Sequence, residues 1–134
     1  VEAAIAGEPV VVFGDGQQVR CFVHVSDVVS DILALMDAPA AVGHVFNLGH
    51  DEPVKILDLA RRVIDLVRPG LSIELRSFAA VFGAALEDAP HRVPDLTKIR
   101  GLTRRTATFS LDTMIREVVA IARAQARRGN GGRA

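Results

Sequence analysis

The strongest local constraint on this chain is a glycine-containing turn, the stretch FGDGQQVR at residues 13–20, which separates two short apolar runs. Glycine accepts a positive φ, so an Asp-Gly pair between two such runs is typical of a β-hairpin connection. The pattern predicts that residues 10–13 and 22–25 form the two strands of a hairpin. Arg20 lies between the turn and the second run, where the hairpin would hold its guanidinium in a fixed place. An ordinary hairpin with a solvated arginine would produce the same pattern.

The size and charge of the chain restrict what it can bind. It has 134 residues, 49% of them hydrophobic, which suits one domain with its own core. Sixteen Lys and Arg balance sixteen Asp and Glu, so the chain has no net field that would gather nucleic acid or an anionic membrane. An anionic ligand would therefore have to meet arginines that the fold places locally.

Other features of the composition indicate where the protein works. A single cysteine, Cys21, excludes an internal disulfide, and no apolar run is long enough to span a membrane. These features indicate a cytoplasmic protein. The chain starts at Val1, already within an apolar pattern and without a methionine, which indicates a piece cut from something longer.

Apolar periodicity predicts several helices. The first is the tail of a helix closed by Gly7, and the second should be capped by Ser26 and stop before Pro39. The third has the clearest division between an apolar and a charged face, and the last should be capped by Ser110. The predicted helices cover residues 1–6, 26–36, 55–67, 94–101 and 111–127.

The remaining segments predict strands and loops. The almost wholly apolar stretch VFNLG at residues 45–49 is typical of a strand covered on both faces, as in a parallel sheet, whereas residues 71–75 alternate like a half-buried strand. Residues 77–90 show no period and should form a loop, and the glycine-rich residues 129–134 should be a disordered tail. There is no internal repeat and no second core, so one α/β unit over residues 1–128 is expected.

Two arginines lie in stretches that glycine or proline stiffens, Arg20 after the turn and Arg92 next to prolines. A guanidinium binds phosphate oxygens bidentately and keeps its charge, so two such arginines suit a diphosphate. Each could instead pair with a nearby carboxylate, such as Asp15 or Glu87.

Other polar residues allow both a structural and a functional interpretation. Asp95 could cap the following helix through the amides of Thr97 and Lys98, or it could hold a ribose with its remaining oxygen. Asn47 within its apolar stretch needs hydrogen-bond partners, which the neighbouring backbone could supply. Phe13 could belong to the core or stack on a base.

Three further patterns carry little weight. His44, His50, Asp51 and Glu52 lack the spacing of metal ligands. His24, Ser26 and Asp27 contain the residue types of a triad, but adjacent residues on a strand point apart and cannot form one. Cys21 has no neighbour that would favour its thiolate, and GDGQQV lacks the third glycine of a dinucleotide-binding loop.

Four blocks in this order resemble one family. They are GEPVVVFGDGQQVRCFVHVSDVV, GHVFNLGHDEPVKILDLA, EDAPHRVPDLTKIR and SLDTMIREVV. They are similar to the C-terminal part of the extended short-chain dehydrogenase/reductases, the NAD-dependent epimerase/dehydratase family that acts on nucleotide-diphosphate sugars. The resemblance runs from Gly7 to about Ala122. It implies an α/β substrate-binding segment with a small β-hairpin, one strand of the parallel Rossmann sheet and several helices, whose N-terminal Rossmann core is missing.

The resemblance also implies roles for particular residues. By position, Arg20 and Arg92 match the arginines that grip the diphosphate of the sugar nucleotide. Asp95 matches an aspartate that reaches the ribose. Three further positions look like groups that line the nucleotide pocket, with the glutamine near the diphosphate: Asn47, Phe13 and Gln18.

The chain departs from the family pattern in three places. Cys21 replaces an aspartate that often follows the first arginine, and TRRTATF at residues 103–109 replaces a loop that usually contains glycine, tryptophan and proline. The glycine-rich NAD loop and the catalytic tyrosine and lysine are absent, and the chain contains no tyrosine. The resemblance therefore leaves open how the last helix packs, and no catalytic residue is assigned.

The expected function is the substrate-binding portion of an NAD-dependent nucleotide-sugar epimerase, similar to UDP-glucose 4-epimerase or to a related decarboxylase or dehydratase. NAD would be bound by the missing N-terminal part, and the parent enzyme would be a homodimer through upstream helices. The segment should not turn over substrate alone. A non-catalytic module that binds a nucleotide or a protein partner is the alternative.

Overall fold

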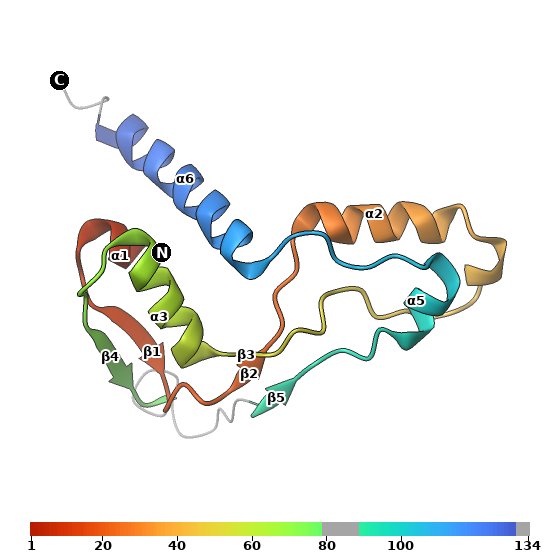
Figure 1. Ribbon diagram of the computed structural model, residues 1–134, viewed down its shortest axis with the longest axis horizontal. Coiled ribbons are helices and arrows are strands. Elements are labelled where there is room, and N and C mark those ends of the chain that lie inside the picture. The colour runs from red at the N-terminus through yellow and green to blue at the C-terminus, as the bar shows by residue number, and fades with distance from the viewer. Residues whose placement is uncertain (79–88, 131–134) are drawn as a thin grey trace.

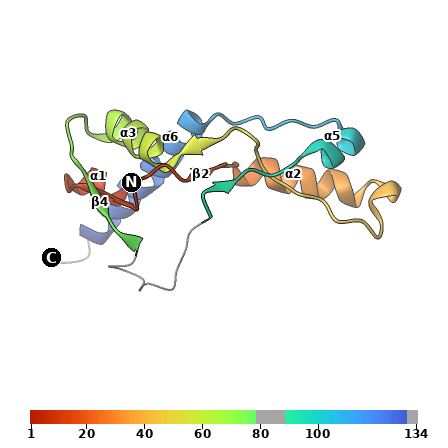
Figure 2. The ribbon, with the colours of Figure 1, turned by 90° about the horizontal axis from the view of Figure 1, so that it is seen from below.

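The structure, a computed structural model, describes residues 1–78 and 89–130. The two ends of the molecule carry different elements: one end has α1, β1, α3 and β4, and the other has α2 and α5 (Figures 1 and 2). The short strands β2, β3 and β5 lie between these ends, and α6 packs on α1 and α3. In chain order the elements are α1 (Glu2–Ala6), β1 (Val10–Phe13), β2 (Val19–Arg20), α2 (Val25–Met36), a 3-10 turn (Pro39–Ala41), β3 (Val54–Lys55), α3 (Ile56–Val67), β4 (Ile73–Arg76), β5 (His91–Arg92), α5 (Thr97–Thr103) and α6 (Leu111–Asn130).

The core forms where α1, α3 and α6 meet. Its buried residues are Ala4, Val63, Leu111, Ile115 and Val119, which come from the apolar faces of these helices. The amphipathic helix predicted for residues 55–67 is thus confirmed as α3, and Ser110 caps α6 as predicted, its Oγ accepting from the Thr113 amide at 3.2 Å. One predicted inward residue of α6, Val118, is instead half exposed.

The predicted hairpin is wrong. β1 pairs in parallel with β4, Val10 opposite Ile73, and residues 22–24 form no strand. The turn itself is as expected, because Gly14 and Gly16 both have positive φ, 72° and 71°. The chain does not return along β1 after this turn because Gly16 packs against the start of α3. The Gly16 carbonyl accepts there from the Leu57 amide at 2.9 Å. The chain then enters β2 rather than returning along β1.

β2 is the middle strand of a second, three-stranded sheet. It pairs antiparallel with β3 and parallel with β5. Val19 of β2 is buried, so its neighbour Arg20 lies on the opposite face of the sheet, where it is only partly buried. The sheet therefore has a packed face and a face that presents Arg20.

The strand predicted at residues 45–49 does not form. The segment is extended without a ladder, and Val45 is 84% exposed. A strand of a parallel sheet needs a neighbouring strand for its backbone groups, and no described strand pairs with this segment, whose contacts with residues 95–100 are made by side chains. The parallel pairs among the described residues are β1 with β4 and β2 with β5.

The helix ends show smaller differences. His24, not Ser26, caps α2, because its Nδ1 accepts from the Ser26 amide at 3.1 Å. α5 continues past Gly101 to Thr103, and α6 continues to Asn130, beyond the predicted start of the tail. The predicted loop at 77–90 and the predicted tail lie largely outside the described residues.

Candidate functional site

The second sheet brings Arg20 and Arg92 side by side. They are register partners in the parallel pair of β2 and β5. Residues in register on neighbouring strands lie about 4.8 Å apart and point to the same face. One guanidinium nitrogen of Arg20 donates to the Val19 carbonyl at 2.7 Å, and both arginines have partners within the fold. Two cationic side chains from opposite halves of the sequence therefore share one sheet face.

Of the two carboxylates considered as alternative partners of the arginines, one lies in the described part of the chain. Asp15 accepts from the amide of Gln17 at 2.9 Å, which stabilises the turn. Glu87 lies outside the described residues.

Asn47 and Asp95 also meet, although through the backbone of the aspartate. The Asn47 side-chain amide donates to the Asp95 carbonyl at 3.1 Å. One carboxylate oxygen of Asp95 accepts from the Thr97 amide at 2.8 Å and so stabilises the entry to α5. Hydrogen bonds from the Thr97 side chain and backbone hold the pKa of Asp95 below its usual value. The predicted contact of Asp95 with the Thr97 amide is confirmed, although Leu96, not Asp95, is the residue directly before α5.

Phe13 and Gln18 form the third contact among the predicted residues. The Gln18 side-chain amide donates to the Phe13 carbonyl at 2.9 Å across the turn. The Phe13 ring lies 6.0 Å from that of Phe78. A Cβ on Gly14 would approach the Phe78 ring to 3.1 Å, so glycine keeps this turn closed.

The Arg20–Arg92 pair, the Asn47–Asp95 contact and the Gln18–Phe13 contact are neighbours along the chain, and we call these six residues the arginine row. Gln18 is within two residues of Arg20, and Arg92 is within three residues of Asp95. Because a residue spans at most about 3.6 Å, each link is short. The row runs from the turn, across β2 and β5, to the start of α5, and it includes every predicted site residue.

A separate cavity of about 590 Å³ contains none of these residues. It lies among β1, the start of α2, α3 and α6, and its lining is apolar except for His24 and Glu117. The apolar lining lacks the cationic groups that a diphosphate needs. We therefore place the candidate site at the arginine row and not in this cavity.

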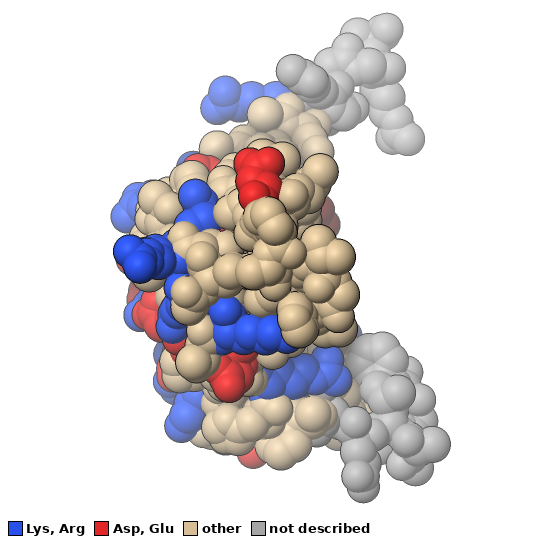
Figure 3. All heavy atoms as spheres, turned by 90° about the vertical axis from the view of Figure 1, so that its right-hand side faces the viewer, with Lys and Arg blue, Asp and Glu red and all other residues tan. Residues whose placement is uncertain are grey.

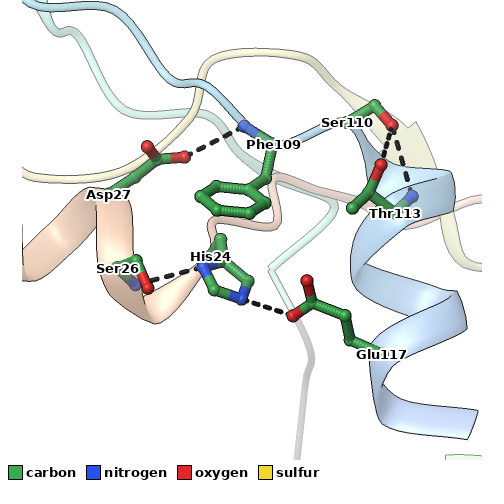
Figure 4. Close-up of polar contacts among 7 residues, drawn as sticks. All are labelled: His24, Ser26, Asp27, Phe109, Ser110, Thr113 and Glu117. Atoms are coloured by element: carbon green, nitrogen blue, oxygen red, sulfur yellow. Dashed lines mark hydrogen bonds and ion pairs between the residues drawn. The ribbon is translucent and has the colours of Figure 1, made fainter. Parts of the chain in front are cut away.

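The sequence did not indicate a polar cluster that connects the start of α2 to α6 and to the loop before it (Figure 4). Asp27 at the start of α2 is only 5% exposed and accepts from the Thr108 and Phe109 amides at 3.0 and 3.3 Å. Burial alone would raise the pKa of Asp27, but these hydrogen bonds outweigh it and lower the pKa below its usual value. The loop at 103–109, whose packing the sequence left open, is thus held to α2.

His24 completes this cluster. Its ring stacks on Phe109, with centroids 3.9 Å apart, and its Nε2 lies 2.8 Å from a Glu117 carboxylate oxygen on α6. Since Nδ1 already accepts from the Ser26 amide, the neutral ring donates from Nε2 to Glu117. His24, Ser26 and Asp27 do not form a triad because Asp27 faces the loop, not the imidazole.

A second unexpected contact joins the segment before β3 to α5. Asp51 and Arg100 form a bidentate pair with N–O distances of 2.6 and 2.8 Å. Hydrogen bonding to Arg100 lowers the pKa of Asp51. No local pattern could have paired residues so far apart in the sequence.

The end of the molecule that carries α2 and α5 has an uneven surface. Figure 3 shows charged side chains gathered toward one side of this end, beside a broad area without them. α5 carries Lys98 and Arg100, whereas α2 contains no basic residue. The exposed apolar side chains of α2 are Val25, Val29, Ile32, Leu33 and Met36.

Metal and thiol chemistry find no support in the described part of the chain. It contains no group of three residues that could hold a metal ion, and Asp51 is engaged by Arg100. Burial raises the pKa of the Cys21 thiol, and the charges of Asp51 and Glu52 raise it further, which disfavours the thiolate. None of the described helices has the length and hydropathy to cross a membrane.

Comparisons with known proteins are consistent in pointing to one family. Residues 1–49 match the model of the NAD dependent epimerase/dehydratase family. The chain is 30% identical over 119 residues to a UDP-N-acetyl-alpha-D-glucosaminuronate decarboxylase of Bacillus cytotoxicus, covering 89% of this chain and 37% of that protein. It is 39% identical over 105 residues to UDP-glucuronic acid decarboxylase 2 of Arabidopsis thaliana, covering 76% of this chain and 21% of that protein.

A solved structure shows the same fold. UDP-glucose 4-epimerase of Thermotoga maritima, solved with UDP-glucose, superposes with a TM-score of 0.81 at 24% identity, over 93% of this chain and 38% of that one. The chain thus spans little more than a third of the length of these relatives, or less. It belongs to the NAD-dependent epimerase/dehydratase family and corresponds to the C-terminal part of its members.

Proposed function

We propose that this chain is the substrate-binding portion of an NAD-dependent nucleotide-sugar epimerase, decarboxylase or dehydratase. In this proposal Arg20 and Arg92 hold the diphosphate. The observation that carries it is the register of β2 and β5, which sets these arginines next to each other on one face. The names of the relatives, which are UDP-sugar enzymes, support the substrate class.

The chemistry of the pair fits a diphosphate. Each guanidinium offers a planar fork of donors to phosphate oxygens and remains charged at any working pH. Since the two side chains come from adjacent strands, they can contact neighbouring phosphates of one ligand. The charge-balanced chain has no general attraction for anions, so this local pair would supply both the affinity and the position.

The other predicted residues would serve the nucleotide. Asp95 has a carboxylate oxygen that the Thr97 amide does not occupy, and this oxygen could accept from a ribose hydroxyl. Asn47 lies against the Asp95 backbone, and Gln18 and Phe13 lie at the other end of the row. We propose that Asn47 and Phe13 line the nucleotide pocket and that Gln18 lies near the diphosphate.

The described residues do not fit the NAD itself. A dinucleotide loop needs a glycine-rich turn that opens a helix, whereas Gly14 and Gly16 lead into β2. The chain also contains no tyrosine. We therefore propose that NAD and the catalytic residues belong to the remaining part of the parent enzyme, and that this chain binds and orients the substrate.

The direct test is calorimetric titration of the chain with UDP and with UDP-glucose. The Arg20→Ala, Arg92→Ala double variant should lose binding by about 100-fold or more, since each phosphate contact of an arginine contributes about 1.5–3 kcal/mol. The matched control is Arg61→Ala, Arg62→Ala on the exposed face of α3, which removes the same charge and should bind like the wild type. Equal loss in both double variants, or wild-type binding that survives the removal of Arg20 and Arg92, would refute the diphosphate assignment.

The alternative is a non-catalytic binding module, which the missing tyrosine would also permit. Turnover assays separate the two possibilities. The chain should show no NAD-dependent conversion of UDP-glucose alone and should support conversion when it is joined to the glycine-loop part of a relative. Failure of the joined protein, with binding intact, would favour the module.

A further inference from the structure

We propose that Asp51 and Arg100 are positioning residues that hold β5 and α5, and with them Arg92 and Asp95, in place beside Arg20. This inference rests on the proposed nucleotide site, because it explains how the second half of that site is placed against the first. Neither residue belongs to the row that would touch the ligand.

The first support is a series of contacts between residues 45–51 and residues 94–100. The Lys98 ammonium donates to the Val45 carbonyl at 2.9 Å and lies 4.7 Å from the centre of the Phe46 ring. The Asn47 amide donates to the Asp95 carbonyl, and the Asp51–Arg100 pair closes the series. These contacts hold the two segments against each other at several points, and we call this series the 45–51 clasp.

The second support is that little of this region lies in long helices or paired strands. α5 has seven residues, and both residues of β5 are exposed. Among the described residues, β5 pairs with β2 over two residues, and the Pro90 carbonyl just before it accepts from the Val19 amide at 2.8 Å. A short exposed edge strand of this kind has little stability of its own. Apolar packing anchors α5 through the buried Leu96 and Ile99, and the clasp adds the polar contacts that orient the segment carrying Arg92 and Asp95.

The third support is the quality of the Asp51–Arg100 pair within the clasp. It is bidentate, which fixes the orientation of both groups as well as their distance. The side chains are 39% and 37% exposed, so the pair is partly shielded from water. The other members of the clasp are single hydrogen bonds or a cation–π contact, which restrict orientation less.

The Asp51–Arg100 pair is connected to both Arg20 and Arg92 through neighbouring elements. Asp51 is three residues before β3, and β3 pairs with β2. The position of Asp51 is therefore tied to the strand that carries Arg20. Arg100 is on α5, which follows β5 and Arg92 closely in the chain. The ion pair therefore joins the two sides of the arginine pair at a point outside the ligand.

The test compares Asp51→Asn with the wild type by two measurements. The first is hydrogen exchange of the amides of residues 91–103 in the chain without ligand. The second is the affinity for UDP by calorimetry. We expect exchange in 91–103 to become about fivefold to tenfold faster and UDP binding to weaken by a similar factor, with exchange in α3 unchanged.

Two further variants sharpen this test. Asp51→Glu keeps the charge and should restore most of both properties. Asp58→Asn removes the exposed Asp58–Arg61 pair on α3 and should change neither, so it controls for the loss of a carboxylate.

The outcomes separate this inference from the proposed function. Unchanged exchange in 91–103, or equal effects of Asp51→Asn and Asp58→Asn, would overturn the clasp. Faster exchange with unchanged UDP affinity would overturn its role in positioning the site. If the wild type binds neither UDP nor UDP-glucose, the proposed nucleotide site fails and the positioning role fails with it, whereas the exchange data would still decide whether the ion pair holds β5 and α5.

Discussion

At the scale of single residues, polar contacts between distant parts of the sequence join α2 to the loop before α6, in addition to the apolar core formed by α1, α3 and α6. Asp27 is the clearest case, because one buried carboxylate serves two backbone amides of the loop before α6. A hydrogen bond between an amide and a charged group contributes about 1.5–3 kcal/mol. This residue therefore connects α2 to the last helix across 81 positions of sequence.

We predict that Asp27→Ala lowers the free energy of unfolding by about 1–3 kcal/mol at pH 7, because the loop amides lose a buried charged acceptor. The folded-state pKa of Asp27 is depressed, so its contribution is complete above the unfolded-state pKa and is lost as the pH falls through the folded-state value. The difference in unfolding free energy between variant and wild type, measured by urea unfolding, should therefore be smaller at about pH 3 than at about pH 7. The exposed Asp65→Ala on α3 is the control, and a difference that stays constant with pH would contradict the prediction.

At the scale of elements, the turn and α3 act as one unit. Gly16 is buried, has a φ of +71°, and a Cβ there would lie 2.8 Å from the Leu57 Cβ. The amides at the start of α3 donate to the carbonyls of Gly16 and Gln18. This close approach turns the chain from β1 into β2 and so sets where Arg20 emerges.

We predict that Gly16→Ala destabilises the chain by about 2–4 kcal/mol, the sum of a strained positive φ and an overlap with α3. Gly70→Ala is the matched control, because Gly70 also has a positive φ, +91°, but nothing lies within 4 Å of its Cβ. It should cost only the conformational term, about 1 kcal/mol. Thermal or urea unfolding measures both, and equal losses would show that the contact with α3 does not matter.

At the scale of the whole molecule, the distribution of apolar surface is unusual. The apolar cavity beside α6 and the exposed apolar side chains of α2 lie on a chain that spans only part of its relatives. Such a surface binds hydrophobic dyes and promotes self-association. The arginine row shares no residue with the cavity lining or with these side chains of α2, so the two surfaces can be tested with separate variants.

We predict that the wild-type chain binds an environment-sensitive dye such as anilinonaphthalene sulfonate, and that Val118→Lys, Ile121→Lys reduces the signal at least about twofold. Both residues line the cavity and are 50% and 58% exposed, so the folded state should tolerate the change. Ala120→Lys, Ala124→Lys adds the same charge to exposed positions of α6 outside the cavity lining and should retain the signal. Equal fluorescence of the two double variants would contradict the prediction.

The sequence by itself determined the elements whose pattern is local. The 3.6-residue apolar period of α3 and α6 depends only on neighbouring residues, and the Asp95 contact with Thr97 spans two positions. The positive φ of Gly14 and Gly16 follows from the turn chemistry. The four ordered blocks also indicated the family.

Only the tertiary structure decided the partners of the strands and of the buried polar groups. An apolar run of four residues, such as β1, can pair with any strand that closes a core, and here β4 fulfils this role. For the same reason, residues 45–49 carry the composition of a buried strand but form none here, because no described strand pairs with them. The register of Arg20 with Arg92 and the contact of Asp51 with Arg100 are long-range, and no local pattern encodes them, because strand pairing is set by the packing of the whole chain.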